Sequence, residues 1–460
     1  MLLSAAKSLI ALLAASALLT ACGGGHGSSA PPPVGGLTLD AGEGGVTLTW
    51  TAVTGVDYWA YTGQSTTICK NCGNNANNWN SLPGAQSRGW STPMSSPYFF
   101  TGNTIQSNLN NNVVYSFIMD GRINGGPGGE ATPAVSAAPR LNGERWFSNG
   151  DPLGKGGVNG LAFGPKFNST TNTFDLTGTY LGLGTGGLKY QSANGLTWTP
   201  ITSDPDTTNW KSATYAFPGT IIQKFIGVGA GGSVVYSNDL VTFKSSTSGS
   251  QDLNAVATSF NTVVAVGNNG TILRTGDGLT WYAAASVPST ANLYAVTYAA
   301  LPSGGLWIAV GAGGVMFVST DASTWSSVSS GTTQDLKGIS ALVNTTYPQG
   351  IYSPLVAPLY SYSVVAVGNA GAVTQTSDGV TWAAQSLGKA NLNAIVASTL
   401  QVPTNQFMVV GDSGKAYTSP DGLSWTARTT TSTENLVGLI RGYNNQYLAW
   451  AANGSTVYSK

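Results

Sequence analysis

The chain has 460 residues, of which 42% are hydrophobic and 8% charged, with 19 basic and 19 acidic side chains. This hydrophobic content is enough for folded domains and excludes a largely disordered chain. The balanced charge provides no overall attraction for nucleic acid, so we expect no nucleic-acid partner. The 61 glycines separate short runs rich in valine, isoleucine, tyrosine and tryptophan, which is typical of an all-β protein with tight turns.

Residues 1–22 have the pattern of an export signal. Lys7 precedes an apolar run from Leu9 to Leu19, which is too short to span a membrane and has the length of a signal-peptide core. The segment ends in LTAC, and this resembles the lipobox of bacterial lipoproteins. The resemblance implies that Cys22 is acylated and that the mature chain is tethered to a membrane. Gly23 replaces the aspartate that retains similar lipoproteins at the inner membrane, so we expect the outer membrane; the alternative is an ordinary signal peptide.

Residues 23–36 read GGGHGSSAPPPVGG, which predicts a flexible tether with a stiffer end. This segment holds the only histidine, His26. Further along, Cys69 and Cys72 form a CxxC pair, and an oxidising compartment favours a disulfide between them. Because a zinc site would need two more ligands, we expect no metal and no cofactor.

Residues 37–139 resemble a fibronectin type III module. GVTLTW, from Gly45 to Trp50, matches its second strand, and VDYWAY, from Val56 to Tyr61, matches its third. Leu109 precedes Tyr115 by six residues, as in the tyrosine corner of that family. A long glycine- and asparagine-rich insertion with Trp79 and Trp90 departs from the pattern; these tryptophans are candidates for stacking on a sugar or for anchoring their own loop.

Residues 140–460 contain a repeat that aligns without gaps over seven positions. Its copies are SANGLTW from Ser192, SNDLVTF from Ser237, TGDGLTW from Thr275, STDASTW from Ser319, TSDGVTW from Thr376 and SPDGLSW from Ser419. The motif resembles the Asp-box, also called the BNR repeat. Each copy follows a VAVG-like strand and a glycine turn, so each unit predicts four strands of the size of one β-propeller blade.

The chemistry of these motifs is structural. An aspartate or asparagine accepts backbone N–H groups in a tight turn, and the tryptophan packs the outer hairpin. Counting the opening strands gives seven blades, of which the last lacks its fourth strand. Residues 144–149, ERWFSN, have the pattern of that missing strand, so we expect them to pair with residues 455–459 and to close the ring.

An enzyme is the alternative to a binding module. Sialidases share Asp-boxes, but this chain lacks their cluster of arginines with a tyrosine–glutamate pair. A glycoside hydrolase needs only two carboxyl groups. The connections between blades and the turns from the second to the third strand lie on one face, where the acids to test are Asp252, Asp335, Asp412 and Glu434.

Two sets of residues are candidates for binding. An Asx residue stands before six innermost strands, and these are Asn209, Asp252, Asn292, Asp335, Asn391 and Asn435. They predict either Asx turns that start the strands or a polar rim that binds a cation or a sugar. On the opposite face, an insertion over residues 344–362 carries Tyr347, Tyr352, Tyr360 and Tyr362. We therefore expect a membrane-tethered, non-catalytic module that binds a protein or a glycan through the propeller.

Overall fold

The computed structural model describes residues 27–42, 44–64, 86–88, 96, 98–100, 109–127, 129–154, 157–346, 359–398, 406–442 and 446–459. Several residues singled out above lie outside these ranges: Cys22, His26, Cys69, Cys72, Trp79, Trp90, Tyr347 and Tyr352. The chain divides into two units, Met1–Pro139 and Arg140–Lys460. Among the described residues, no helix has the length and apolar character needed to cross a bilayer.

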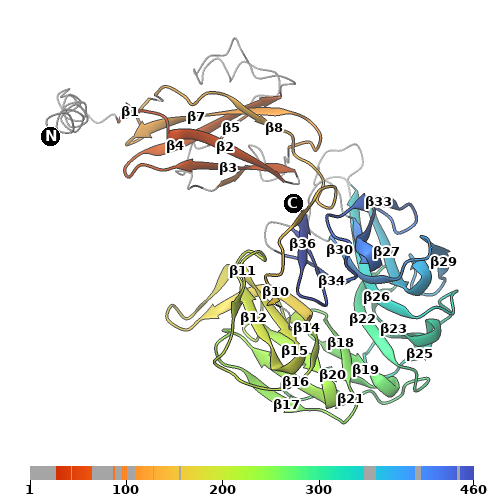
Figure 1. Ribbon diagram of the computed structural model, residues 1–460. Coiled ribbons are helices and arrows are strands. Elements are labelled where there is room, and N and C mark those ends of the chain that lie inside the picture. Colours follow the sequence, from red (N-terminus) through yellow and green to blue (C-terminus); the bar gives the residue numbers. More distant parts are fainter. Residues whose placement is uncertain are drawn as a thin grey trace. The chain divides into compact units, whose positions relative to one another are not determined.

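The N-terminal unit contains two antiparallel sheets (Figure 1). One sheet consists of β1 (Ser28–Ala30), β4 (Asp57–Gln64), β5 (Gln86–Arg88), β7 (Tyr115–Ile123) and β8 (Val135–Ala137). The other consists of β2 (Val34–Gly42), β3 (Gly45–Thr51) and β6 (Tyr98–Phe100). Alternate residues of β3 are buried, and they pack with aromatic residues of both sheets in one core. Members of this core are Val46, Leu48, Trp50, Tyr58, Phe100, Tyr115 and Phe117.

The structure corrects the expected tether in its second half. Residues Ser28–Ala30 form β1, which pairs with Gly121–Ile123 of β7, and β2 begins at Val34. Strand β8 covers only Tyr115–Phe117 on this side of β7. Gly121–Ile123, at the other end of that edge, would otherwise expose unpaired N–H and C=O groups, and β1 provides partners for them. A composition of serine, alanine and glycine did not reveal this pairing, because the partner lies far along the chain.

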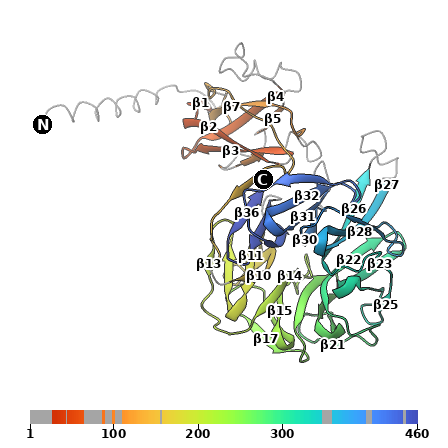
Figure 2. The same ribbon diagram turned by 45° about the vertical axis from the view of Figure 1, so that its right-hand side comes forward.

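The second unit is built from seven four-stranded antiparallel sheets, counted over its described residues. We number the sheets 1 to 7 by their innermost strands, which are β10 (Val158–Asn168), β14 (Trp210–Ala216), β18 (Leu253–Thr258), β22 (Leu293–Leu301), β26 (Leu336–Thr346), β30 (Leu392–Ala397) and β34 (Leu436–Arg441). Each innermost strand contacts the next one, and β34 contacts β10. The sheets therefore form a closed ring, which is the architecture of a β-propeller (Figures 1 and 2).

The other strands follow outward in chain order. The second strands are β11 (Thr173–Gly184), β15 (Lys224–Gly229), β19 (Val263–Gly267), β23 (Gly304–Gly311), β27 (Leu359–Gly368), β31 (Phe407–Gly411) and β35 (Tyr447–Ala451). The third strands are β12 (Lys189–Ser192), β16 (Ser233–Ser237), β20 (Ile272–Thr275), β24 (Met316–Ser319), β28 (Ala372–Thr376), β32 (Lys415–Ser419) and β36 (Thr456–Ser459). The outermost strands are β13 (Thr199–Pro200), β17 (Lys244–Thr247), β21 (Tyr282–Ala283), β25 (Ser326–Ser327), β29 (Ala383–Ser386), β33 (Thr426–Thr429) and β9 (Trp146–Ser148).

A short 3-10 turn joins the second strand to the third in sheets 1 to 6. These turns are η2 (Thr185–Gly187), η3 (Ala230–Gly232), η4 (Asn268–Gly270), η5 (Ala312–Gly314), η7 (Asn369–Gly371) and η8 (Asp412–Gly414). The second strands are nearly continuous apolar runs, and every residue of β19, β31 and β35 is buried. Such runs are expected where a strand is covered on both faces by neighbouring sheets.

The seven-residue repeat forms the turn between the third and fourth strands. In sheet 3, Asp277 Oδ1 accepts the N–H groups of Leu279 and Thr280 at 2.8 and 2.9 Å, and Thr275 Oγ1 donates to the same oxygen at 2.9 Å. The matching residues Asn194, Asp239, Asp321, Asp378 and Asp421 make the same two backbone contacts. The repeat therefore folds the turn, which is the structural role that its residues predict.

The seventh sheet takes its outermost strand from the beginning of the unit. Strand β9 pairs with β36, with Trp146 opposite Ser459, as the sequence predicts. Ser459 Oγ accepts the N–H of Gly143 at 2.7 Å, and Trp146 Nε1 donates to Gly143 O at 3.0 Å. Ser192, Gly195 and Trp198 make the same two contacts within one repeat. A seventh repeat turn is thus split between the two ends of the unit, with NGERW from Asn142 providing its second part.

Candidate functional site

The Asx residues that precede the innermost strands connect adjacent sheets. In each case the side-chain oxygen Oδ1 accepts the N–H of the central residue in the 3-10 turn of the preceding sheet. The pairs are Asn209 with Gly186, Asp252 with Gly231, Asn292 with Asn269, Asp335 with Gly313, Asn391 with Ala370 and Asn435 with Ser413, at 2.8 to 3.0 Å. We call these six residues the Asx ring.

This finding corrects the expectation that the Asx side chains bond the start of their own strand. The 3-10 turn holds its central residue at positive φ, for example 55° at Asn269, and directs that N–H away from its own sheet. The adjacent sheet brings an acceptor to it. The six Oδ1 atoms are therefore each engaged with a different turn. Among the described residues, no group of three or more His, Cys, Asp or Glu is placed to hold a metal ion.

A second ring lies one residue further along the chain. The pairing of each innermost strand with its neighbour skips the strand's second residue, so this residue forms a β-bulge at the same end of the ring. We call these seven residues the mouth ring: Asn159, Lys211, Asn254, Tyr294, Lys337, Asn393 and Val437. Sequence reasoning did not identify them. Their position directly after the buried first residue of each strand was the available signal.

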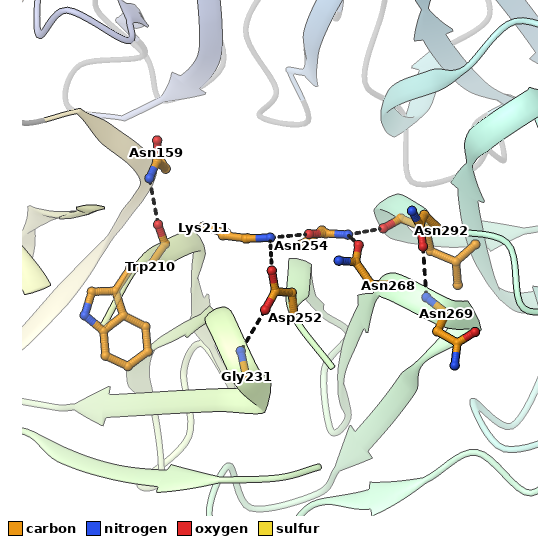
Figure 3. A network of polar contacts seen from close by, with 10 residues as sticks. Asn159, Trp210, Lys211, Gly231, Asp252, Asn254, Asn268, Asn269 and Asn292 are labelled. Carbon is orange, nitrogen blue, oxygen red and sulfur yellow. Dashed lines mark hydrogen bonds and ion pairs between the residues drawn. The ribbon is translucent and has the colours of Figure 1, made fainter. Parts of the chain in front are cut away.

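Three neighbouring members of the mouth ring, Asn159, Lys211 and Asn254, make polar contacts with the adjacent sheets (Figure 3). Lys211 Nζ donates to Asp252 Oδ2 at 2.8 Å and to Asn254 Oδ1 at 3.0 Å. Asn254 Nδ2 in turn donates to the carbonyl of Leu293 at 2.9 Å, and Asn159 Nδ2 donates to the carbonyl of Trp210 at 2.8 Å. Each asparagine thus bonds the first residue of the next innermost strand, so the ring residues are held in fixed positions.

On the other side of the mouth ring, the ammonium group of Lys337 lies over the aromatic face of Tyr294. Lys337 Nζ lies 3.8 Å from the centre of the Tyr294 ring and 3.5 Å from Asp335 Oδ2. An ammonium at this distance is attracted to the electron-rich face of the ring. Asn393 Nδ2 donates to Leu436 O at 3.0 Å and to Asp412 Oδ1 at 2.9 Å. This side therefore presents an amine, a phenol and an amide together.

Three of the four acids expected at this end, Asp252, Asp335 and Asp412, are engaged with neighbouring donors. Asp252 bonds Lys211 and the Gly231 N–H, and both contacts hold the pKa of its carboxyl below its ordinary value. Asp412 accepts Nδ2 of Asn391 and of Asn393. Glu434 has an exposed side chain, and its carbonyl accepts the Gly414 N–H. A general acid in a glycosidase needs a raised pKa, and the environment of Asp252 has the opposite effect.

The predicted tyrosine surface lies at the other end of the sheets. Tyr360 and Tyr362 belong to the long hairpin of β26 and β27, where they pair with Thr345 and Val343. Their ring centres are 6.5 Å apart. Tyr360 is 55% exposed, whereas Tyr362 packs against the core between sheets 4 and 5. Only Tyr360 of this pair therefore offers most of its surface to a partner.

A comparison with protein families agrees with the propeller architecture. Residues 356–460 match a family model described as the DUF6242 beta propeller domain. A search of curated proteins finds no match. Similar solved structures include "YCF48 bound to D1 peptide", with 14% identity, 68% of this chain and 94% of that chain covered and a TM-score of 0.49. YCF48 from Cyanidioschyzon merolae has 15% identity, coverage of 68% and 98% and a TM-score of 0.48. The WD40 propeller of Doa1 has 7% identity, coverage of 69% and 96% and a TM-score of 0.47.

Proposed function

We propose that the chain is a membrane-tethered, non-catalytic interaction module whose seven-bladed propeller binds a protein or a glycan at the mouth ring. A contrast between neighbouring positions of the innermost strands carries this proposal. The first residue of each strand is buried and apolar in all seven sheets. The third residue is glycine, alanine or serine throughout, and the glycines are closely packed. A Cβ on Gly160 would lie 2.7 Å from Ser212 Cα of the adjacent innermost strand, and one on Gly438 would lie 2.0 Å from Trp450 Cζ2.

The second residue, which forms the mouth ring, is free of these packing demands. It is asparagine at three places, lysine at two, tyrosine at one and valine at one. The seven repeats have therefore kept their packing residues and diverged where the side chains reach the mouth. Amines, amides and an aromatic ring in fixed positions suit hydrogen bonding to a peptide or stacking on a sugar. A glycoside hydrolase or sialidase-like activity is a weaker candidate, because Asp252 and Asp335 are each paired with a lysine.

The test compares the wild-type protein with a triple variant of the mouth, Lys211→Ala, Tyr294→Ala and Lys337→Ala. A matched control replaces Lys166 and Tyr282, which lie away from the mouth, with alanine. Both variants and the wild type are applied to a glycan array and to cross-linking pull-downs from cell-envelope fractions. We expect to find ligands that bind to the wild type and to the control but not to the triple variant. Equal binding by the wild type and the triple variant contradicts the proposal.

We also propose that the N-terminal unit is a fibronectin type III-like module and that the repeat turns are Asp-boxes. Support for the first comes from the strand arrangement, with β2, β3 and β6 in one sheet and β4, β5, β7 and β8 in the other. In addition, Tyr115 Oη accepts the N–H of Asn110 at 3.0 Å, the contact expected of a tyrosine corner. The Asp-box assignment is supported by the side-chain oxygens that accept two backbone N–H groups in each repeat turn. In this proposal the module is a spacer or a second contact surface.

The proposed membrane tether is an acyl group on Cys22, and the lipobox-like sequence LTAC supports it. Replacement of Cys22 by serine is expected to move the protein from the membrane fraction to the soluble fraction, measured by fractionation and immunoblotting. Equal retention of both proteins in the membrane fraction contradicts acylation at Cys22. The proposed disulfide between Cys69 and Cys72 predicts two thiols that are alkylated under denaturing conditions only after reduction. Complete alkylation without reductant would reject the disulfide.

A further inference from the structure

A hollow in sheet 2 opens at the end of the propeller opposite the mouth. Its volume is about 270 Å³, and its lining includes Ile221, Ile222, Lys224, Tyr236 and Lys244. The β14–β15 loop forms one wall, and the repeat turn from Ser237 forms another. Both connections lie at the far end of their strands from η3, which belongs to the mouth end. The hollow is therefore separate from the proposed binding surface at the mouth.

The β14–β15 loop holds an apolar side chain in solvent. Ile221 is 96% exposed and Ile222 is 41% exposed. Internal hydrogen bonds fix this loop: Thr220 N and Oγ1 both donate to Phe217 O, and Gly219 N donates to Gln223 Oε1 at 3.0 Å. An exposed isoleucine on a rigid loop loses little conformational entropy when a partner covers it.

Backbone strain is present in both loops around the hollow. Phe217 has a φ of 55° and Leu240 a φ of 58°, although both are large residues with buried side chains. Four of the other five repeat turns have glycine where Leu240 stands. Left-handed conformations of bulky residues are uncommon and cost free energy, and such strain is found preferentially at binding sites.

The charged side chains that line the hollow are both lysines. Lys224 Nζ donates to the carbonyl of Asp277 at 2.9 Å, and Lys244 is exposed at the start of β17. No lining residue is acidic. The nearby carboxylates of Asp239 and Asp277 each accept two backbone N–H groups of their own turn. Burial lowers the pKa of the Lys224 amine, and the charge of Asp277 opposes this shift only in part, so a further carboxylate in the hollow would stabilise the charged amine.

We propose that this hollow binds a peptide segment of a partner protein in which an aliphatic side chain stands beside a carboxylate. The aliphatic group packs on Ile221 and Ile222, and the carboxylate pairs with Lys224 and Lys244. An anionic membrane would also meet lysines and isoleucines here. However, a flat surface would approach all five turn aspartates at this end, which include Asp321, Asp378 and Asp421, and it would be repelled by them.

The test uses the full chain in detergent and a fluorescent peptide whose centre alternates leucine and glutamate within a glycine–serine frame. Control peptides replace the leucines with serine or the glutamates with lysine. Fluorescence anisotropy measures Kd. We expect binding of the leucine–glutamate peptide alone, weakened by added salt. Failure of this peptide to bind, or equal binding of the lysine peptide, overturns the proposal.

Substitutions locate the binding. Ile221→Ser is expected to raise Kd by about tenfold or more, and Lys244→Gln to raise it severalfold and to reduce its salt dependence. Phe260→Ser is the matched control, because Phe260 is 74% exposed but does not line the hollow. The control and the triple variant of the mouth are both expected to bind like the wild type, so failure here is distinguishable from failure of the mouth proposal. An unchanged Kd for folded Ile221→Ser overturns the assignment. A second outcome also overturns the assignment: no peptide binds, but the protein binds phosphatidylglycerol vesicles and Ile221→Ser abolishes that binding.

Discussion

The two units of this protein are stabilised in different ways. Over its described residues, the N-terminal unit has a principal core between two sheets and a buried charged network, in which Asp120 contacts Arg122 and Tyr61. The propeller instead repeats a small set of contacts around a ring. Six Asx side chains join adjacent sheets, and six repeat turns use the same carboxylate or amide contacts.

This difference determines where a single change has large consequences. In the N-terminal unit a unique buried network makes one residue decisive. In the propeller each repeated contact contributes modestly, and the loss of one leaves the others in place. Two places are exceptions. The buried Lys189 forms ion pairs with Asp204 and Asp206, which no other sheet repeats among the described residues. At the closure between sheets 7 and 1, Gly157 stands where the Asx ring would have its seventh member and offers no side-chain acceptor. The pairing of β9 with β36 is therefore the contact on which the ring depends.

The largest effect is expected from deletion of residues 447–460. This removes β35 and β36, and it exposes the cores on both sides of sheet 7, which include Trp146, Tyr180 and Leu439. The loss exceeds the roughly 5 to 15 kcal/mol that stabilises a typical domain, so the whole propeller should unfold. Calorimetry of the wild type and the truncated chain measures this. A truncated propeller that melts at the wild-type temperature would show that the sheets are independent.

The next effect is expected at Asp120, whose side chain is fully buried. Asp120→Ala leaves Arg122, whose side chain is 16% exposed, without its carboxylate, and such a loss costs about 3 kcal/mol. Asp120→Asn retains an oxygen for Tyr61 and Arg122 and should cost less. The calorimetric transition of the N-terminal unit should shift, whereas that of the propeller should not. Equal shifts of both transitions would mean that the units do not unfold separately.

A smaller effect is expected in the Asx ring. Asn292→Ala removes the acceptor of the Asn269 N–H, which is 2.9 Å away, and water replaces it in part. The expected cost is about 1 kcal/mol, or a shift of about 2 °C in the Tm of the propeller. Asn292→Asp keeps the acceptor oxygen and is the control, since Asp252 and Asp335 occupy equivalent places. If the aspartate variant is as unstable as the alanine variant, the contact between sheets is not the cause.

The smallest effect is a difference in response to acid. Backbone N–H groups of Thr324 and Ser323 lower the pKa of Asp321 from 3.8 to about 2. Its stabilising contribution is complete above 3.8 and is lost as the pH falls towards 2. Burial raises the pKa of Asp120, so acidification relieves the cost of its buried charge. We therefore expect acid to lower the Tm of the propeller more than that of the N-terminal unit. Asp321→Asn, which resembles the natural Asn194 turn, should weaken this dependence; an unchanged dependence would assign it to other acids.

The sequence by itself predicted several features of the fold. Alternating apolar strands, glycine turns and the seven-residue repeat indicate four-stranded sheets, because strand and turn preferences act over a few neighbouring residues. The incomplete last unit and Trp146 together predicted the closing strand. The sequence also placed Asp252 and Asp335 at the same end of the ring. The split repeat turn, with Ser459 at one end and Asn142 to Trp146 at the other, could have been recognised fully from the same alignment.

Other features depend on contacts between segments far apart in the chain. The strand β1 was missed because its partner, Gly121–Ile123, is distant in sequence. The backbone N–H donors to the Asx ring were assigned to the wrong sheet, since local periodicity does not show how neighbouring sheets approach one another. The mouth ring arises from a bulge in every innermost strand, and only the packing of seven sheets around an axis places Lys211, Tyr294 and Lys337 at one opening. Local sequence thus determined each sheet, and tertiary packing determined the surfaces that the sheets present together.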